Sequence, residues 1–244
     1  MFKSEVKQAV LRQVVDAVSI IVGEGKFRVS QNGISMKSVD PTHVAMVDLE
    51  LDRSAFETFE VTDLELGVDI EKLKNVLKLA SPSDVVTLYL DEETNRLVLN
   101  MGNLVRSMSM LDTRHMTDPK IPDMELPASV VMDGEELDRG IRAAENISDH
   151  VIISTDSESF ELQAEGDTDA VDLKIPRDLL LDLKCDKEVK SIFALSYFSN
   201  MIRAAKASKV VKIGLGVDYP VKIEFDIADG KGHVLYLLAP RIPG

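Results

Sequence analysis

The sequence of 244 residues contains no tryptophan, and aromatic side chains make up only 5% of it. Cys185 is the single cysteine, which excludes an internal disulfide and any metal cluster built from several cysteines. The four histidines are His43, His115, His150 and His233, and no two of them have the spacing of paired metal ligands. We therefore expect a core of Val, Ile, Leu and Met in a protein kept in a reducing compartment.

Long hydrophobic runs and targeting segments are also missing. The apolar stretch 9–22 is interrupted by Arg12 and Asp16, so it is not expected to span a membrane. Residues 1–5 do not have the form of a signal peptide. The sequence predicts a soluble, intracellular protein, cytoplasmic in a prokaryote and nuclear if the source is eukaryotic.

Enzyme motifs are sparse as well. There is no P-loop, no nucleotide-binding glycine triad after a strand and no Gly-x-Ser-x-Gly. The best evidence for a small hydrolase is Asp40-Pro41-Thr42-His43 with Asp48 nearby, which could be an acid–base or metal site. The segment 112–115 (DTRH) is more simply explained as a polar turn than as a catalytic or metal site. We predict no enzymatic activity, no catalytic residue, no metal and no cofactor, and keep the hydrolase as the weaker alternative.

What the chain does contain is an internal repeat, with an offset of 124 to 129 residues. Residues 47–51 match 171–175, residues 83–90 match 208–215, and the apolar positions of 11–21 match those of 137–147. Each half has two helical stripes, predicted at 8–22 and 70–80, and again at 135–147 and 196–209. Short β-type segments separate them, including a hairpin around Gln31-Asn32-Gly33.

This pattern predicts an α+β fold of two similar domains, each with two helices packed on antiparallel sheets. We place the first domain at 1–114 and the second at 128–244. The segment 115–127 between them is rich in proline and lacks periodicity, so it is expected to be an exposed connector. Uncovered sheet edges in such domains would be removed if identical chains paired edge to edge into a ring.

The net charge of −14 alone argues against nucleic acid, but the charges are unevenly distributed. The four predicted helices hold nine basic and six acidic residues, a balance of +3, whereas the rest of the chain has 19 basic and 36 acidic residues, or −17. A weakly basic helix surface on an acidic body suits loose, sequence-independent contact with phosphates. The nine bases are Arg12, Lys72, Lys74, Lys78, Arg139, Arg142, Arg203, Lys206 and Lys209.

Several segments resemble the PCNA family of DNA sliding clamps. The segment 38–47 (SVDPTHVAMV) is similar to the signature of the family's first domain, and Leu66-Gly67-Val68 and Ile121-Pro122 continue the match. The segment 237–242 (LLAPRI) is similar to its closing motif, so the resemblance covers essentially the whole chain. The C-terminal end of the sequence resembles that of the archaeal members of this family.

The resemblance implies a closed trimer with pseudo-sixfold symmetry, whose helices line a hole around duplex DNA. The nine helix bases would then face the DNA. It also implies a clamp loader, and tethering of DNA polymerase, flap endonuclease and DNA ligase by partner motifs with a glutamine and an aromatic plug. A subunit that assembles only with different partners, as in checkpoint-type or heterotrimeric clamps, is an alternative with the same features.

Two further surfaces follow from the resemblance alone. The partner groove would be formed by Val39, His43, Val44, Met46, Ile121, Pro220, Leu237, Ala239, Pro240 and Ile242. The subunit contact would pair a strand at about 104–110 with one at about 170–175, using Leu104, Arg106, Met108, Met110, Val171, Leu173 and Ile175.

Overall fold

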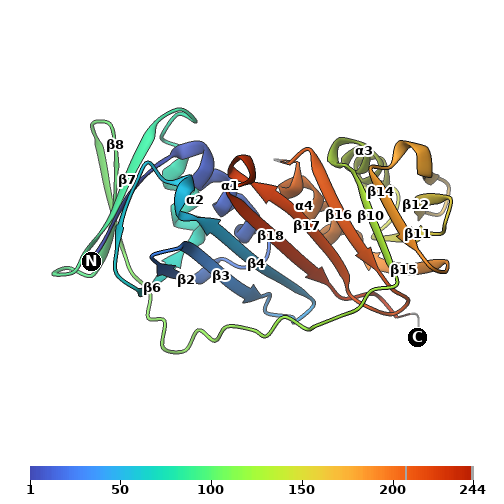
Figure 1. Ribbon diagram of the computed structural model, residues 1–244, viewed down its shortest axis with the longest axis horizontal. Coiled ribbons are helices and arrows are strands. Elements are labelled where there is room, and N and C mark those ends of the chain that lie inside the picture. The colour runs from blue at the N-terminus through green and yellow to red at the C-terminus, as the bar shows by residue number, and fades with distance from the viewer. Residues whose placement is uncertain (207, 243–244) are drawn as a thin grey trace. The chain divides into compact units, whose positions relative to one another are not determined.

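The computed structural model describes residues 1–206 and 208–242, and the chain forms two compact units (Figure 1). The first unit contains Met1–Pro41, Val47–Lys120 and Asp226–Val234. The second contains Thr42–Met46, Ile121–Phe225 and the residues from Leu235 onward. Each unit therefore includes a short segment from the other half of the sequence: residues 226–234 in the first unit and residues 42–46 in the second.

The elements follow each other in the same order in both halves of the sequence. The first half has β1 (Phe2–Lys7), α1 (Gln8–Ser19), β2 (Glu24–Ser30), β3 (Gly33–Val39), β4 (Ala45–Asp52), β5 (Thr58–Val61), β6 (Leu64–Asp69), α2 (Ile70–Leu77), β7 (Val85–Asp91), β8 (Arg96–Met101) and β9 (Leu104–Ser109). The second has β10 (Ala128–Asp133), α3 (Gly134–Ala144), β11 (His150–Thr155), β12 (Ser159–Glu165), β13 (Ala170–Pro176), β14 (Asp182–Cys185), β15 (Val189–Ala194), α4 (Leu195–Ala205), β16 (Val210–Leu215), β17 (Val221–Ile227) and β18 (Gly232–Leu238). Three single 3-10 turns, Arg53–Ala55, Arg177–Leu179 and Ala228–Gly230, complete the described elements.

The sheets repeat in the same way. In the first unit one sheet has the order β5-β1-β7-β8-β9, and the other contains β4-β3-β2-β6, with the first residues of β18 beside β4. In the second unit the corresponding orders are β14-β10-β16-β17-β18 and β13-β12-β11-β15. Neighbouring strands such as β1 and β5, β7 and β8, β10 and β16, and β12 and β13 pair antiparallel. The predicted α+β fold with an internal repeat is thus confirmed.

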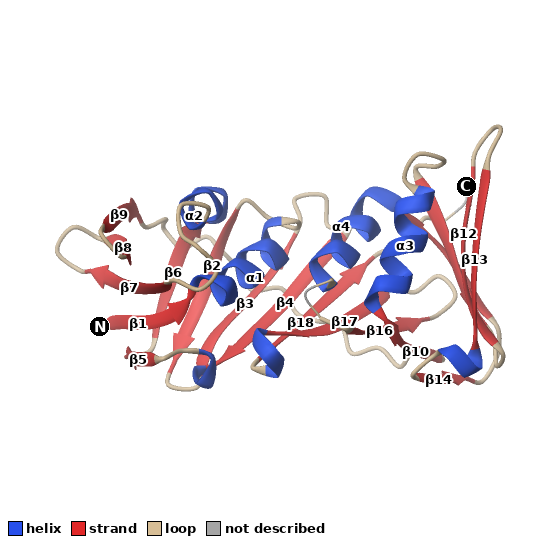
Figure 2. Ribbon diagram, turned by 90° about the horizontal axis from the view of Figure 1, so that it is seen from above, coloured by secondary structure: helices blue, strands red, loops and turns tan. Residues whose placement is uncertain are grey.

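Helices α1 and α2 pack against each other in the first unit, and α3 and α4 do so in the second (Figure 2). On α1, Leu11, Val14 and Val18 form the buried stripe that the helical spacing predicts. Asp69 and Asp133 cap α2 and α3, because their carboxylates accept hydrogen bonds from the backbone N–H of Lys72 (2.9 Å) and Glu135 (2.7 Å). These packed stripes leave the polar sides of the helices free of the cores.

The hairpin between β2 and β3 shows why a glycine is needed at one position. Ser30 pairs with Gly33, so the turn consists of Gln31 and Asn32. Gly33 has φ of +140°, and a Cβ there would lie 2.0 Å from the carbonyl oxygen of Leu51. The hairpin was predicted correctly, and the positive φ that it requires belongs to Gly33.

The helices are shorter than the periodicity predicts. We expected helices at 8–22, 70–80, 135–147 and 196–209, whereas they end at Ser19, Leu77, Ala144 and Ala205. The apolar pattern continues past three of these ends, at Ile21, Leu79 and Ile147. As a result Lys78 and Lys209 lie just beyond α2 and α4. The strands β5 and β14 were not predicted, because each has only four residues.

Between β9 and β10 the chain crosses residues 110–127 with no helix or strand, apart from one bridge of Leu111 to Gly67. Its start is fixed to the first unit by Asp118, which pairs with Lys26 (3.1 Å) and with Arg28. Lys26 is only 9% exposed and also lies 3.6 Å from Glu65. Among the described residues, no helix is long and apolar enough to cross a membrane.

Candidate functional site

The predicted basic surface of the first unit contains a carboxylate shared by two bases. Asp16 on α1 accepts from Arg12, with Nε 2.7 Å from Oδ2, and lies 3.3 Å from the ammonium of Lys74 on α2. Lys72 pairs with the capping carboxylate of Asp69 at 2.8 Å. Hydrogen bonds from the side chain and the backbone of Lys72 lower the pKa of Asp69. Arg12, Lys72 and Lys74 are therefore partly neutralised by these two carboxylates.

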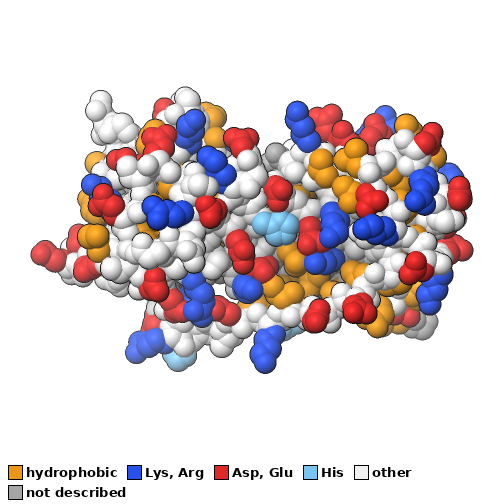
Figure 3. Space-filling view, viewed as in Figure 1, with side chains coloured by type: hydrophobic (Ala, Val, Ile, Leu, Met, Phe, Trp, Pro, Cys, Tyr) orange, Lys and Arg blue, Asp and Glu red, His pale blue; other side chains and the backbone are white. Residues whose placement is uncertain are grey.

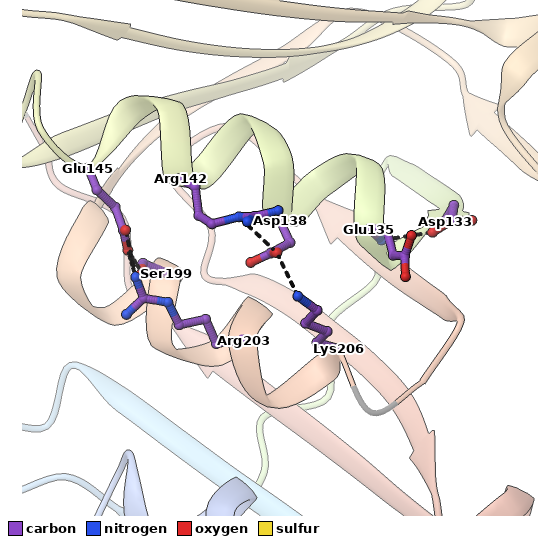
Figure 4. A network of polar contacts seen from close by, with 8 residues as sticks. All are labelled: Asp133, Glu135, Asp138, Arg142, Glu145, Ser199, Arg203 and Lys206. Carbon is purple, nitrogen blue, oxygen red and sulfur yellow. Dashed lines mark hydrogen bonds and ion pairs between the residues drawn. The ribbon is translucent and has the colours of Figure 1, made fainter.

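The second unit repeats this arrangement on α3 and α4 (Figure 4). Asp138 lies 3.1 Å from Nε of Arg142 and 3.5 Å from Nζ of Lys206, and its side chain is 3% exposed. Glu145, at the end of α3, pairs with Arg203 of α4 at 2.6 Å and also accepts from the hydroxyl of Ser199. Arg139 forms a further pair with Glu136 (2.8 Å). The four bases Arg139, Arg142, Arg203 and Lys206 are thus exposed to solvent, but each is paired with a neighbouring carboxylate.

Two of the nine predicted bases differ from the rest. Lys78 donates to the side-chain oxygen of Asn75 at 2.9 Å, and Lys209 is exposed in the turn before β16. Among the ion pairs of residues 1–206 and 208–242, neither has an acidic partner. The helix surfaces therefore offer several weak phosphate contacts and few strong ones, which is suited to holding a polyanion without reading its sequence.

The predicted partner groove begins with an apolar cluster in the second unit. Met46 of β4 packs with Leu235 and Leu237 of β18, and Ile121 and Met124 of the connector pack against them. Beside this cluster is a pocket of about 280 Å³, whose lining includes Ile121, Pro122 and Leu237. Figure 3 shows hydrophobic side chains gathered near the connector on the face that bears β17 and β18. An extended apolar side chain could be buried here.

The other predicted groove residues lie around the C-terminal tail. The backbone N–H of Ala239 donates to the carbonyl of Val44 (2.9 Å), and the next residue, Pro240, is half-buried. Arg241 fixes the tail through its N–H to Ile192 O (2.7 Å) and its guanidinium to Asp149 (3.3 Å). Beyond it, the side chain of Ile242 is 71% exposed.

Three further residues were assigned to the groove. His43 is exposed and has a positive φ of 58°, and Pro220 is half-buried before β17. Val39 is the last residue of β3 and belongs to the first unit. The structure thus places Met46, Ile121 and Leu237 in one cluster, and Val44 and Ala239 in direct contact.

Sequence reasoning missed Leu235, Met124 and Lys222, which belong to the same cluster or pocket. A signal was present for two of them. Leu235 and Leu237 alternate along one strand, so their side chains point to the same face. Met124 follows Ile121 by three residues in a connector that otherwise has few large apolar side chains.

The predicted subunit contact falls on two edge strands, each in its own unit. On β9, Leu104 and Arg106 are exposed and Met108 is buried, and Met110 follows the strand. Two apolar residues that the sequence did not single out lie beside them: Leu79 (65% exposed) and Val105 (59% exposed), which line a shallow apolar pocket with Val76 of α2. Such an exposed apolar edge is unusual in a chain that functions alone.

On β13, the other predicted contact strand, the apolar residues alternate. Val171 and Leu173 are half-buried and Ile175 is buried. Leu173 packs so closely on α3 that a Cβ at Gly140 would lie 2.5 Å from it. The apolar side of β13 thus faces its own helix, while its outer backbone edge has no neighbouring strand among the described ones.

The residues of the alternative hydrolase site make other contacts. Asp48 pairs with Lys37 at 3.3 Å, and Asp40 is buried. Asp112 accepts hydrogen bonds from Arg114, which lower its pKa, as expected for a polar turn. Within the described residues, no cluster of three His, Cys, Asp or Glu could hold a metal ion.

Comparison with known proteins agrees with these features. Residues 1–118 match the family described as proliferating cell nuclear antigen, N-terminal domain, and residues 120–241 match its C-terminal domain. The chain is 42% identical over 243 residues to proteins named DNA polymerase sliding clamp from Methanococcoides burtonii and Methanocella arvoryzae, covering 99% of each chain. It superposes on PCNA from A. fulgidus, solved with the C-terminal region of FEN-1, with a TM-score of 0.94, 30% identity and full coverage of both chains. For PCNA from Thermococcus kodakaraensis the TM-score is 0.90, with 26% identity and coverage of 99% of this chain and 100% of that one.

These matches cover both halves of the repeat and agree with the domain order found in the fold. The archaeal relatives match over their full length, so the likeness is not confined to one domain. The chain belongs to the proliferating cell nuclear antigen family of DNA sliding clamps, which are processivity factors and not enzymes.

Proposed function

We propose that three copies of this chain close into a ring around duplex DNA and tether DNA polymerase, flap endonuclease and DNA ligase to it. The observation that carries this proposal is a difference between the two halves of the repeat. The last strand of the second half, β18, has β4 as a neighbour, whereas the strands that correspond to these two in the repeat, β9 and β13, are edges of the described sheets. Pairing of β9 with β13 of another copy would repeat the β18–β4 pairing between subunits.

The side chains around these edges support the same pairing. Leu79, Leu104 and Val105 present apolar surface beside β9, which would be removed from water in a closed ring. Because the apolar side chains of β13 pack on α3, this strand would contribute mainly backbone hydrogen bonds to the contact between subunits. A junction of this kind is extended and regular, and it removes both edges at once.

The helix surfaces support the DNA part of the proposal. A chain with a net charge of −14 repels phosphate overall, so a single copy should bind duplex poorly. A closed ring needs no tight contact, because topology prevents escape. The nine bases would then guide the duplex along the helices while exchanging phosphate partners as the ring slides.

The apolar cluster of Met46, Leu235 and Leu237 supports binding of a short partner motif with a glutamine and an aromatic plug. PCNA from A. fulgidus was solved with the C-terminal region of FEN-1 bound to it. We propose that this chain likewise binds segments of partner enzymes, and that an ATP-driven clamp loader loads it. We also keep the domain division 1–114, 115–127 and 128–244, and a cytoplasmic location in a prokaryotic cell.

Light scattering of the purified chain tests closure. We expect a molar mass of about 81 kDa, three times the 27.0 kDa of one chain, that is stable on dilution to micromolar concentration. A monomer under these conditions would favour the alternative of a clamp subunit that requires different partner subunits, while leaving the fold untouched.

A further inference from the structure

The ion pairs on the helix surfaces form the same arrangement twice, with the charges exchanged. Because β1 and β10, and likewise α1 and α3, begin 126 residues apart, Arg12 corresponds to Asp138 and Asp16 to Arg142. In both units, an acid and a base four residues apart on one helix form a pair. In both units a lysine from the other helix region, Lys74 or Lys206, approaches the same carboxylate.

The two halves therefore use different residues to reach one result, a carboxylate shared by two bases. With Glu145 and Arg203 included, three carboxylates hold five of the nine predicted DNA-facing bases. A repeat that keeps the pairing while exchanging its members indicates that the charge balance itself has a purpose. A simple surplus of bases would have required no shared acids.

The burial of these carboxylates differs, and this affects their strength. The side chain of Asp138 is 3% exposed, whereas that of Asp16 is 37% exposed. The charge of Asp138 is poorly screened by water, so it must keep a cation nearby. A phosphate that binds Arg142 or Lys206 therefore competes with Asp138 for the same base.

We propose that Asp16 and Asp138 limit the affinity of the ring for duplex DNA, so that phosphate contacts stay weak enough for sliding. This inference rests on the proposed function, because it requires that the helices face the DNA. A base that is already paired with a carboxylate releases few counterions when it binds phosphate. Asp16 and Asp138 each pair with two bases in this way. Removing the carboxylates should therefore tighten DNA binding, although no new contact is added.

The test is equilibrium binding of the purified ring to a short duplex by fluorescence anisotropy, over a series of salt concentrations. For the double variant Asp16→Asn and Asp138→Asn we expect affinity to rise about tenfold near 0.1 M salt, with a steeper salt dependence. The matched control is Asp63→Asn with Asp229→Asn, which removes the same charge from exposed positions outside the helices. The control should change affinity less than threefold.

Because Asp138 is buried, the single variant Asp16→Asn is measured as well, and it should show a smaller rise of the same sign. Equal effects of the double variant and its control would overturn the proposal. A third variant, Lys78→Ala with Lys209→Ala, separates the two possible failures. If it weakens binding while the aspartate variants do nothing, the helices face DNA but the carboxylates do not limit affinity. If none of the helix variants differs from the control, the proposed DNA path fails together with this inference.

Discussion

At the scale of single residues, the proposed partner groove depends on a few apolar side chains of the connector, β4, β18 and the tail. Ile121 and Met124 are half-buried against Met46, Leu235 and Leu237, so they already have a fixed place before any partner binds. Ile242, in contrast, is exposed and gains contacts only if a partner covers it. A peptide with an aromatic plug would gain affinity by burying such side chains.

Replacing Ile121 and Ile242 together by Asp should weaken binding of a glutamine–aromatic partner peptide by more than tenfold. The new carboxylate at position 121 must lose its hydration when the peptide binds, and Lys222, which lines the pocket, already pairs with Glu224 (3.1 Å). Isothermal titration calorimetry measures the effect, and the molar mass of the assembly should not change. Leu181→Asp, at an exposed apolar position away from the groove, is the control and should bind normally. Affinity within twofold of the wild type in the double variant would show that the groove lies elsewhere.

Asp118 gives a prediction about pH. Burial raises its pKa, but hydrogen bonds and charges from Lys26 and Arg28 outweigh this and hold the pKa below its ordinary value. A carboxylate with a lowered pKa stabilises the folded chain above its unfolded pKa of about 3.9, and this stabilisation is lost as the pH falls through the folded value. Asp118→Asn should therefore lower the free energy of unfolding by about 1–3 kcal/mol at neutral pH, since it leaves the buried Lys26 with Glu65 alone.

Chemical denaturation at several pH values checks this. The difference between the variant and the wild type should be constant at neutral pH and shrink below about pH 4. Glu125→Gln, an exposed change of the same kind in the connector, should cost little at any pH. A difference that persists unchanged at low pH would mean that the ion pairs of Asp118 do not stabilise the fold.

At the scale of elements, β9 and β13 are the strands on which the proposed assembly depends. Val105→Pro should dissociate the ring at micromolar concentration, because proline removes a backbone donor and distorts an edge that must pair. Analytical ultracentrifugation follows the mass, and circular dichroism follows the fold, which should remain. Glu60→Pro, on β5 at the opposite edge of the same sheet, is the matched control. Equal dissociation by both would indicate general damage to the sheet and contradict a specific β9 contact.

Elements also show how far the sequence could be interpreted. The repeat, the α+β class and all four helices follow from apolar spacing, since stripes such as Leu11, Val14 and Val18 have one structural solution. Helix ends did not follow, because apolar residues such as Ile21, Leu79 and Ile147 continue past α1, α2 and α3, and only tertiary packing decides where hydrogen bonding stops. Four-residue strands such as β5 and β14 carry too little pattern to be recognised alone.

The site was partly predictable for the same reasons. The spacing of the bases predicted which of them lie on the helices, apart from Lys78, Lys206 and Lys209, which lie beyond the helix ends. The sharing of Asp16 and Asp138 depends on how two helices pack, which no local pattern gives. In the groove, Leu235 and Met124 were missed, because they meet Met46 only after distant segments fold together. Exposed apolar residues such as Leu79 stand out only once solvent exposure is known.

At the scale of the whole molecule, the charge distribution predicts how the ring uses its helices. Neutralising six of the helix bases should impair loading and processivity while leaving the molar mass of the ring unchanged. The six are Lys74, Lys78, Arg139, Arg142, Arg203 and Lys206. Neutralising six exposed lysines outside the helices should do much less, namely Lys3, Lys120, Lys184, Lys187, Lys190 and Lys231. Primer extension on circular templates with polymerase and loader, titrated with salt, measures this, and equal losses in both sets would mean that the helices do not line the DNA path.

The central claim is that the chain holds DNA by topology and not by affinity, and the fate of a loaded ring on circular DNA tests it most directly. The ring, labelled with a fluorophore, is loaded onto a nicked circular duplex, separated from free protein by gel filtration, and the circle is then cut once with a restriction enzyme. We expect the ring to stay on the uncut circle in moderate salt and to leave soon after cutting, because only the free ends allow it to slide off. Loss at the same rate from cut and uncut circles would contradict the account, and so would retention on linear DNA with open ends.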